Sequence, residues 1–119
     1  MGRDLAGFYD SAYARGGERH ARWRELGARG KADHVEELAA RSRLDASSVV
    51  EVGCGDGALL AELSARGFGG TLTGFEISEA ALDLARSRSI PRAVRLDAFD
   101  GQHLPAAGGE FSLGVLSHV

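Results

Sequence analysis

The chain has 119 residues, of which 44% are hydrophobic and 26% are charged, and its formal net charge is −3. This composition is typical of one soluble globular domain, no apolar run approaches the ~20 residues of a membrane span, and the acidic balance makes nucleic-acid binding an unfavoured function. The single cysteine excludes an internal disulfide and a cysteine-based zinc cluster. With no signal-peptide core at the N-terminus, we expect a cytoplasmic protein that has no membrane contact and needs no metal.

Residues 1–46 are predicted to form an N-terminal arm that packs on the rest of the domain. Residues 1–30 are polar with scattered aromatic side chains, and the glycines at 16–17 and 27–30 interrupt the helical pattern. We therefore expect only one or two helical turns there. A helix over 32–43 is better supported, because its apolar residues recur on one face.

The stretch from Val49 to Leu60 is predicted to be a buried strand, a glycine turn and the start of a helix. The β-branched residues Val49, Val50 and Val52 suit a strand, whereas helix-spaced apolar residues follow from Ala58. The alternate glycines between them allow the backbone to turn sharply and a ligand to lie close against it. Free N–H groups at the start of the helix favour an anionic group. The stretch therefore has the outline of a nucleotide-cofactor site.

Strands and helices continue to alternate after this turn. The first helix is expected to end at Gly67, a residue suited to the left-handed position beyond a helix. Ser78 is a good N-cap for the next helix, which Ile90-Pro91 ends. The expected elements are a helix over 58–66, strands over 71–77 and 93–96, the latter closing on Asp97-Ala98, and a fourth strand over 111–116.

Strands that alternate with helices at this spacing predict parallel βαβ units with right-handed crossovers. The expected fold class is therefore α/β, a Rossmann-like, doubly wound and mostly parallel sheet in a three-layer αβα arrangement with a helical N-terminal arm. Residues 47–119 would form the ligand-binding half of this sheet. Because a parallel sheet needs both faces covered and the sequence stops after an apolar fourth strand, we expect it to be truncated, the N-terminal part of a longer domain.

The residues around the glycine turn resemble a known family. The motif Glu51-Val52-Gly53-Cys54-Gly55-Asp56-Gly57 is similar to the glycine motif of class I S-adenosylmethionine-dependent methyltransferases, the methyltransferase type 11 domains in particular. Glu76 closes the second strand, Asp97-Ala98 closes the third, and residues 111–119 look like the family's fourth strand. The resemblance covers about residues 47–119.

The resemblance implies a cofactor, S-adenosylmethionine, with S-adenosylhomocysteine as the product. The backbone of Gly53, Cys54 and Gly55 would approach the methionyl part of the cofactor, and Glu51 would hold its ammonium group directly or through water. Glu76 would accept hydrogen bonds from both ribose hydroxyls, because one carboxylate offers two oxygens to two donors.

The resemblance also implies an adenine site at the end of the third strand. Asp97 would accept a hydrogen bond from the adenine amino group, and the backbone N–H of Ala98 would face a ring nitrogen. Ile77 and Phe99 would sandwich the ring. Leu116 lies where relatives pass under the sulfonium group.

The implied reaction transfers a methyl group to an oxygen, nitrogen or carbon nucleophile of a small-molecule acceptor. Because the cofactor is already activated, the protein mainly aligns the two partners and removes a proton where needed. No residue is assigned as catalytic. The N-terminal arm would cover the cofactor, and Tyr13 resembles the aromatic lead-in that does so in many relatives. The oligomeric state stays open, with a homodimer as one option.

Two other functions remain open. The pattern Gly53-x-Gly55-x-x-Ala58 also fits the looser glycine signature of NAD(P)-dependent oxidoreductases, with an acidic residue after the second strand. Glu51 before the glycines and the third glycine, Gly57, count against that function. A cofactor-binding but inactive module that acts through protein contacts is the second alternative.

Single residues also have purely structural interpretations. Glu51 could be a strand-end charge that reaches water, and Asp97 could be a strand-terminating residue. Cys54 is expected to contribute its backbone and a small apolar side chain rather than a reactive thiol. His118 is a candidate base near a strand end, but a packing or surface histidine is the better explanation.

Overall fold

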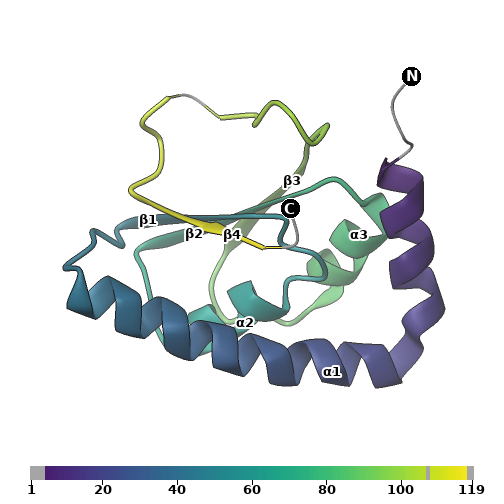
Figure 1. Ribbon diagram of the computed structural model, residues 1–119, viewed down its shortest axis with the longest axis horizontal. Coiled ribbons are helices and arrows are strands. Elements are labelled where there is room, and N and C mark those ends of the chain that lie inside the picture. The colour runs from purple at the N-terminus through teal and green to yellow at the C-terminus, as the bar shows by residue number, and fades with distance from the viewer. Residues whose placement is uncertain (1–4, 107, 118–119) are drawn as a thin grey trace.

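The computed structural model describes residues 5–106 and 108–117, with side chains from residue 22 onward. Its elements follow the alternation expected from the sequence (Figure 1). In chain order they are α1 (Leu5–Arg41), β1 (Ser48–Val52), α2 (Ala58–Ala65), β2 (Thr71–Glu76), α3 (Glu79–Ser87), β3 (Val94–Ala98) and β4 (Leu113–Leu116).

The four strands of the described chain form one parallel sheet in the order β3-β2-β1-β4. Val50 in the middle of β1 lies beside Thr73 on one side and Gly114 on the other. Successive strands move outward from β1 through α2 and α3, and the chain then crosses back to place β4 against the free side of β1. In open α/β sheets this reversal marks the crevice where ligands bind, at the carboxyl ends of the strands. The predicted Rossmann-like parallel sheet is confirmed.

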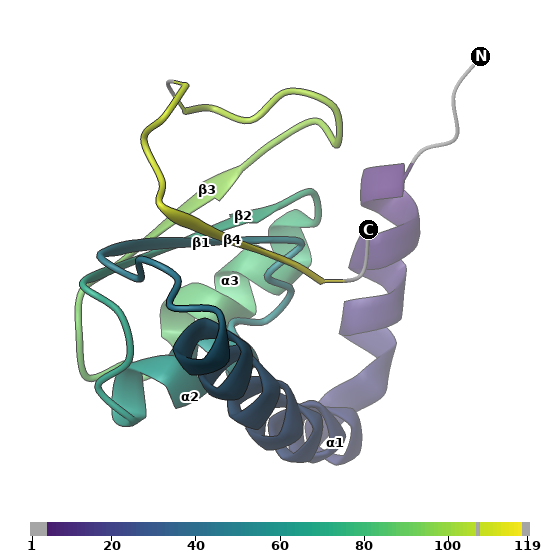
Figure 2. The ribbon, with the colours of Figure 1, turned by 60° about the vertical axis from the view of Figure 1, so that its left-hand side comes forward.

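The helices α2 and α3 and the C-terminal part of α1 cover the same face of the sheet (Figures 1 and 2). On that face, Val49 and Leu72 of the strands pack with Leu60, Leu63 and Leu82 of the helices in one hydrophobic core. Alternate residues of a strand point to opposite faces, so these side chains come from one side of β1 and β2. Full burial of each such side chain contributes roughly 1.5–3 kcal/mol, and this helical layer therefore anchors the fold.

The opposite face of the sheet carries the loop between β3 and β4. The Phe111 ring of this loop meets the fully buried Phe75 ring edge-on, with ring centroids 6.0 Å apart. The Arg95 guanidinium lies 5.3 Å from the centre of the Phe75 ring and donates to the Pro105 carbonyl and the Glu110 carboxylate. β4 begins at Leu113, two residues later than the sequence pattern predicts.

The N-terminal region is a single helix, α1. The prediction that its glycines interrupt the helix is therefore wrong. Gly27 and Gly30 lie within the helix on its exposed side, where an added Cβ would meet no atom within 4 Å. A helical glycine costs only about 1 kcal/mol relative to alanine. Ala28 lies between these glycines and Ala32 follows them, and both alanines are buried in the core against α2. Tertiary packing thus overrides the local helix-breaking signal.

The two parts of α1 lie at different places on the domain. The N-terminal part bends away from the rest and stands beside the carboxyl ends of the strands in both views (Figures 1 and 2). The remainder lies against α2 and α3. None of the helices in residues 5–106 and 108–117 combines the length and the apolar character needed to cross a lipid bilayer.

Local signals at the ends of the shorter elements are confirmed. Ser78 is the N-cap of α3, and its hydroxyl accepts a hydrogen bond from the Ala81 amide at 3.1 Å. Gly67 follows α2 with a φ of 70°, as expected of a left-handed residue beyond a helix. Asp97 and Ala98 close β3.

Candidate functional site

The glycine turn between β1 and α2 is the centre of the candidate site. Gly53, Gly55 and Gly57 have φ angles of 82°, 57° and 80°, in a region that residues with a Cβ rarely adopt. The Gly53 amide donates to the Phe75 carbonyl oxygen of β2 at 2.8 Å. A Cβ on Gly57 would come within 3.0 Å of the Ala85 Cβ in α3. The predicted sharp turn is present, and it packs too closely on its neighbours to accept larger residues.

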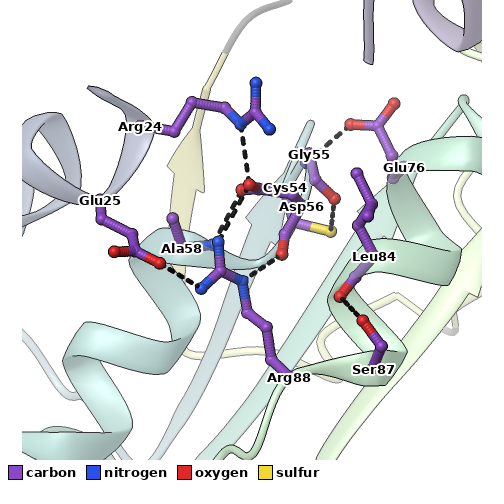
Figure 3. A network of polar contacts seen from close by, with 10 residues as sticks. All are labelled: Arg24, Glu25, Cys54, Gly55, Asp56, Ala58, Glu76, Leu84, Ser87 and Arg88. Carbon is purple, nitrogen blue, oxygen red and sulfur yellow. Dashed lines mark hydrogen bonds and ion pairs between the residues drawn. The ribbon is translucent and has the colours of Figure 1, made fainter. Parts of the chain in front are cut away.

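Glu76, at the end of β2, braces this turn. The Glu76 side chain is buried. One of its carboxylate oxygens accepts a hydrogen bond from the Gly55 amide, and the other accepts one from the Ser78 amide, both at 2.8 Å (Figure 3 shows the Gly55 contact). A carboxylate has about four acceptor positions, so roughly two remain after these two bonds. Glu76 therefore joins the glycine turn to the start of α3 and retains acceptor capacity for a ligand.

Glu51, in β1 just before the turn, is a buried acid with an unused oxygen. The residue is 3% exposed, and its Oε1 atom has no hydrogen-bond partner among the described residues. Burial raises the pKa of the Glu51 carboxyl to about 7, although a hydrogen bond with Ser117 and the charge of Lys31 oppose the rise. A buried acceptor without a partner is rare in folded proteins, and a cationic or hydrogen-bonding ligand would satisfy it.

Two cavities adjoin Glu51 and the end of β4. One, of about 250 Å³, lies between α1 and the glycine turn, with Trp23 and Lys31 on one side and Glu51 on the other. A second, of about 320 Å³, lies between α1 and β4 and is lined in part by Lys31 and Leu116. Leu116 is 72% exposed. Since the C-terminal half of α1 contributes to both cavities, this helix belongs to the site as much as the glycine turn does.

The residues predicted to contact adenine gather at the carboxyl ends of β2 and β3. Ala98 lies beside Glu76 in the sheet register, and the Phe99 amide donates to the Glu76 carbonyl oxygen at 3.2 Å. Ile77 and Phe99 are half-buried there. One carboxylate oxygen of Asp97 accepts a hydrogen bond from Arg95 at 2.7 Å. Its adenine contact stays a prediction.

Two predicted residues lie outside the described side chains, and one residue that was not predicted lies in the site. Tyr13 and His118 fall outside the side chains that the structure describes. Asp56, between two of the glycines, was not predicted to take part, yet it is 4% exposed and lies against the arginines at 24 and 88 (Figure 3). The acid inside the glycine motif is the only sequence signal that indicates a role for Asp56.

Among the described residues, no group of three or more histidine, cysteine, aspartate and glutamate side chains is arranged to hold a metal ion.

Cys54 serves packing within the turn. Its side chain is buried, and burial raises the pKa of the thiol well above its ordinary value, with the nearby Glu51 and Glu76 charges adding to the rise. A Cβ on Gly74 of β2 would come within 2.8 Å of the Cys54 sulfur. Because Gly74 has no side chain, there is room beside it for the sulfur of Cys54. This agrees with the prediction that Cys54 contributes a small apolar side chain.

We expect Cys54 to resist alkylation in the folded protein. Only the thiolate reacts, and both burial and the raised pKa keep its population low at pH 8. Iodoacetamide labelling followed by mass spectrometry should show slow modification in buffer and rapid modification in denaturant. Rapid labelling of the folded protein would contradict the packing role.

The chain is similar to methyltransferase domains. A family model described as a methyltransferase domain matches residues 49–119. A search of curated proteins found no match.

Solved structures agree with this family match. CalS10 from Micromonospora echinaspora, an amino pentose methyltransferase solved with bound S-adenosylmethionine, is 31% identical, with a TM-score of 0.57 over 98% of this chain and 44% of its own. DesVI from Streptomyces venezuelae is 30% identical, with a TM-score of 0.56 over 98% and 44%. An S-adenosylmethionine-dependent methyltransferase from Clostridium acetobutylicum ATCC 824, at 22% identity, shares the fold with a TM-score of 0.62 over 71% and 34%.

The chain spans between a third and a half of the length of these relatives. The family model nevertheless covers more than half of the chain, and it includes the glycine turn, Glu51, Glu76 and Asp97. The predicted resemblance is therefore confirmed: the chain belongs to the methyltransferase domain family, with the fold of class I S-adenosylmethionine-dependent methyltransferases.

Proposed function

We propose that this chain binds S-adenosylmethionine and that the protein transfers the methyl group to a small-molecule acceptor, leaving S-adenosylhomocysteine. The observation that carries the proposal is the buried Glu51 carboxylate, whose Oε1 atom has no partner among the described residues although it lies next to the glycine turn. An amino-acid ammonium group placed there would satisfy that oxygen and offset the cost of burying its charge.

The other residues of the site suit the remaining parts of the same cofactor. Gly53 and Gly55 leave the backbone open to close approach by its methionyl part. Glu76 keeps acceptor positions that two ribose hydroxyls would use. Ile77 and Phe99 are half-buried at the end of β2, where they would flank adenine.

The charge of the site also fits a cationic cofactor. Glu76 and Asp56 lie close enough to Glu51 for their charges to raise its pKa further. Because Asp56 is paired with two arginines, the carboxylates left to act on a ligand are those of Glu51 and Glu76. They favour a ligand with a positive ammonium and a positive sulfonium over the pyrophosphate of a dinucleotide. This observation and the family match favour methyl transfer over an NAD(P)-dependent oxidoreductase.

The bound cofactor supplies an activated methyl group, and the chain supplies alignment. Holding the cofactor and an acceptor in line makes the reaction effectively intramolecular, for which effective molarities of ~10⁵ M or more are known. No described residue is assigned as an acid or a base. The N-terminal part of α1 stands at the carboxyl ends of the strands (Figure 2), and we propose that this arm, including Tyr13, covers the cofactor there.

A small-molecule acceptor is proposed because CalS10, an amino pentose methyltransferase, resembles nearly the whole of this chain. The nucleophile can be an oxygen, nitrogen or carbon atom. If the protein were a cofactor-binding but inactive module instead, it would bind the cofactor and turn over none of a range of acceptors.

Side-by-side calorimetric titrations with S-adenosylhomocysteine and NADH test the proposal. We expect saturable binding of S-adenosylhomocysteine and no measurable binding of NADH. The variant Glu37→Gln, which removes an exposed charge on α1 remote from the turn, should bind as the wild type does. Binding of NADH alone would instead support the oxidoreductase.

A further inference from the structure

Asp56, in the glycine turn, is the centre of a buried ionic network. Its Oδ2 atom accepts from the Arg24 Nε at 2.7 Å and from the Arg88 Nη2 at 2.9 Å, and its Oδ1 atom accepts from the Ala58 amide at 3.2 Å (Figure 3). The Asp56 side chain is only 5% exposed, and the two arginines are 24% and 20% exposed. The carboxylate is thus held by two guanidinium groups away from most of the solvent.

The network joins two helices, α1 and α3, to the turn. Arg24 belongs to α1, Arg88 is the residue that ends α3, and Asp56 lies between β1 and α2. Arg88 makes two further contacts, because its Nε donates to the Asp56 carbonyl oxygen at 2.6 Å and its Nη1 lies 3.3 Å from the Glu25 carboxylate of α1. One arginine therefore fixes both the backbone and the side chain of the turn and ties them to α1.

The turn needs such contacts because glycine favours no single conformation. Gly55 and Gly57 flank Asp56, and each has many backbone states to lose when the turn is ordered. Glu76 restrains the turn from the side of β2 through the Gly55 amide. The arginines restrain it from the side of the helices. Two opposed sets of contacts thus hold the amides and the open backbone that a ligand would meet.

We propose that Arg24, Asp56 and Arg88 are positioning residues that couple the docking of α1 to cofactor binding at the glycine turn. The inference rests on the proposed function, since it concerns the same cofactor. When α1 is docked, the two arginines hold the turn in the geometry that binds the cofactor. When the cofactor is bound, the ordered turn places Asp56 where both arginines can contact it. Each event favours the other, as thermodynamic linkage requires.

The first test compares the affinity for S-adenosylhomocysteine among variants of the intact protein. Asp56→Asn keeps the size and the Ala58 contact but removes the charge, and Arg88→Lys and Arg24→Lys keep the charge but lose the forked donors. We expect each to weaken binding by roughly tenfold, within the usual range of such couplings. The double variant of Asp56→Asn with Arg88→Lys should bind less weakly than the two single effects combined would give, because both changes remove the contact between the Arg88 guanidinium and the Asp56 carboxylate.

Two surface arginines provide matched controls. Arg86 lies on α3 beside Arg88 but pairs only with Glu79 and Asp83 at 3.8 and 3.5 Å among the described ion pairs. Arg41 lies on α1 and pairs with Glu37 at 3.2 Å. Arg86→Lys and Arg41→Lys should leave the affinity within twofold of the wild type.

The second test separates coupling from simple stabilisation. In the wild type, S-adenosylhomocysteine should slow hydrogen exchange of the α1 amides around residues 22–28 as well as those of the turn. In Arg24→Lys, which changes the α1 residue that contacts Asp56, the slowing in α1 should be lost while that in the turn remains. A residue with only a structural role would raise the exchange of α1 equally with and without the ligand, leaving the difference intact.

The outcomes distinguish this inference from the proposed function. A wild-type protein that does not bind S-adenosylhomocysteine would overturn both. Binding by the wild type, with unchanged affinity in both lysine variants and in Asp56→Asn, would overturn the coupling alone. If Asp56→Asn does not fold, the two lysine variants and the exchange measurement decide the question.

Discussion

Replacing Glu76 with alanine should abolish measurable binding of S-adenosylhomocysteine and also destabilise the fold. The carboxylate is buried and accepts from the amides of Gly55 and Ser78. Alanine would leave both buried N–H groups without a partner, at roughly 1–3 kcal/mol each. If two ribose hydroxyls also donate to this carboxylate, their loss alone weakens binding by at least about 100-fold. Calorimetry gives the affinity, and thermal unfolding gives the change in stability.

A second substitution at this position separates the two effects. Glu76→Gln keeps one carbonyl oxygen with two acceptor positions and replaces the other oxygen with an NH₂ donor, so it can accept at most two of the four hydrogen bonds proposed for the carboxylate. We expect a folded protein of intermediate stability that still binds much more weakly than the wild type. The control Glu79→Ala removes an exposed acid in the first turn of α3 and should leave the affinity unchanged. Wild-type affinity in Glu76→Gln would contradict the ribose contact.

Replacing Glu51 with glutamine should make the ligand-free protein more stable above pH 7 and the bound complex weaker. Burial raises the pKa of the Glu51 carboxyl from 4.5 to about 7. The folded state therefore binds more protons than the unfolded state between these values, so stability falls as the pH rises from 4.5 to 7 and the full cost is present above pH 7. One pKa unit corresponds to about 1.4 kcal/mol, so the buried charge costs on the order of 3 kcal/mol. Glutamine removes this cost.

The same substitution should change the pH dependence of binding. In the wild type, affinity for S-adenosylhomocysteine should increase from pH 6 to pH 8, because Glu51 loses its proton and can then hold the ammonium group as a charge-assisted partner. In Glu51→Gln the affinity should be about 10-fold lower at pH 8 and nearly independent of pH over this range. Calorimetry and thermal unfolding at several pH values measure both effects.

The exposed Glu37→Gln serves again as the control, because Glu37 is 59% exposed and should change neither stability nor affinity measurably. A Glu51→Gln variant that is less stable than the wild type at pH 8 would show that the Ser117 hydrogen bond and the Lys31 charge outweigh the cost of burying the carboxylate. Unchanged affinity would remove Glu51 from the cofactor contacts.

The parts of the fold that depend on local chemistry could be predicted from the sequence. The positive φ angles of the motif require glycine, and the hydroxyl of Ser78 caps the helix that directly follows it. The parallel sheet follows from the alternation of strands and helices, because parallel neighbours need a helical crossover. In each case the residues that decide the outcome are close together in the chain.

Features that depend on distant residues could not be predicted in this way. The continuity of α1 depends on the burial of Ala28 and Ala32 under α2, which no local pattern shows. The arginines that contact Asp56 lie 32 positions away on either side, in helices whose contacts with the turn no local sequence pattern indicates. By contrast, the contact between Asp97 and Arg95 could have been predicted, because residues two apart in a strand share a face.

The long helix also changes where the boundary of this domain should be drawn for engineering. The family match begins at residue 49, yet Arg24 and Lys31 of α1 contact or adjoin the acids of the site. A chimera that transplants only the matched segment onto another protein would carry the glycine turn without Arg24, one of the side chains that hold it. A chimera built from this chain should therefore carry the helix and the sheet together.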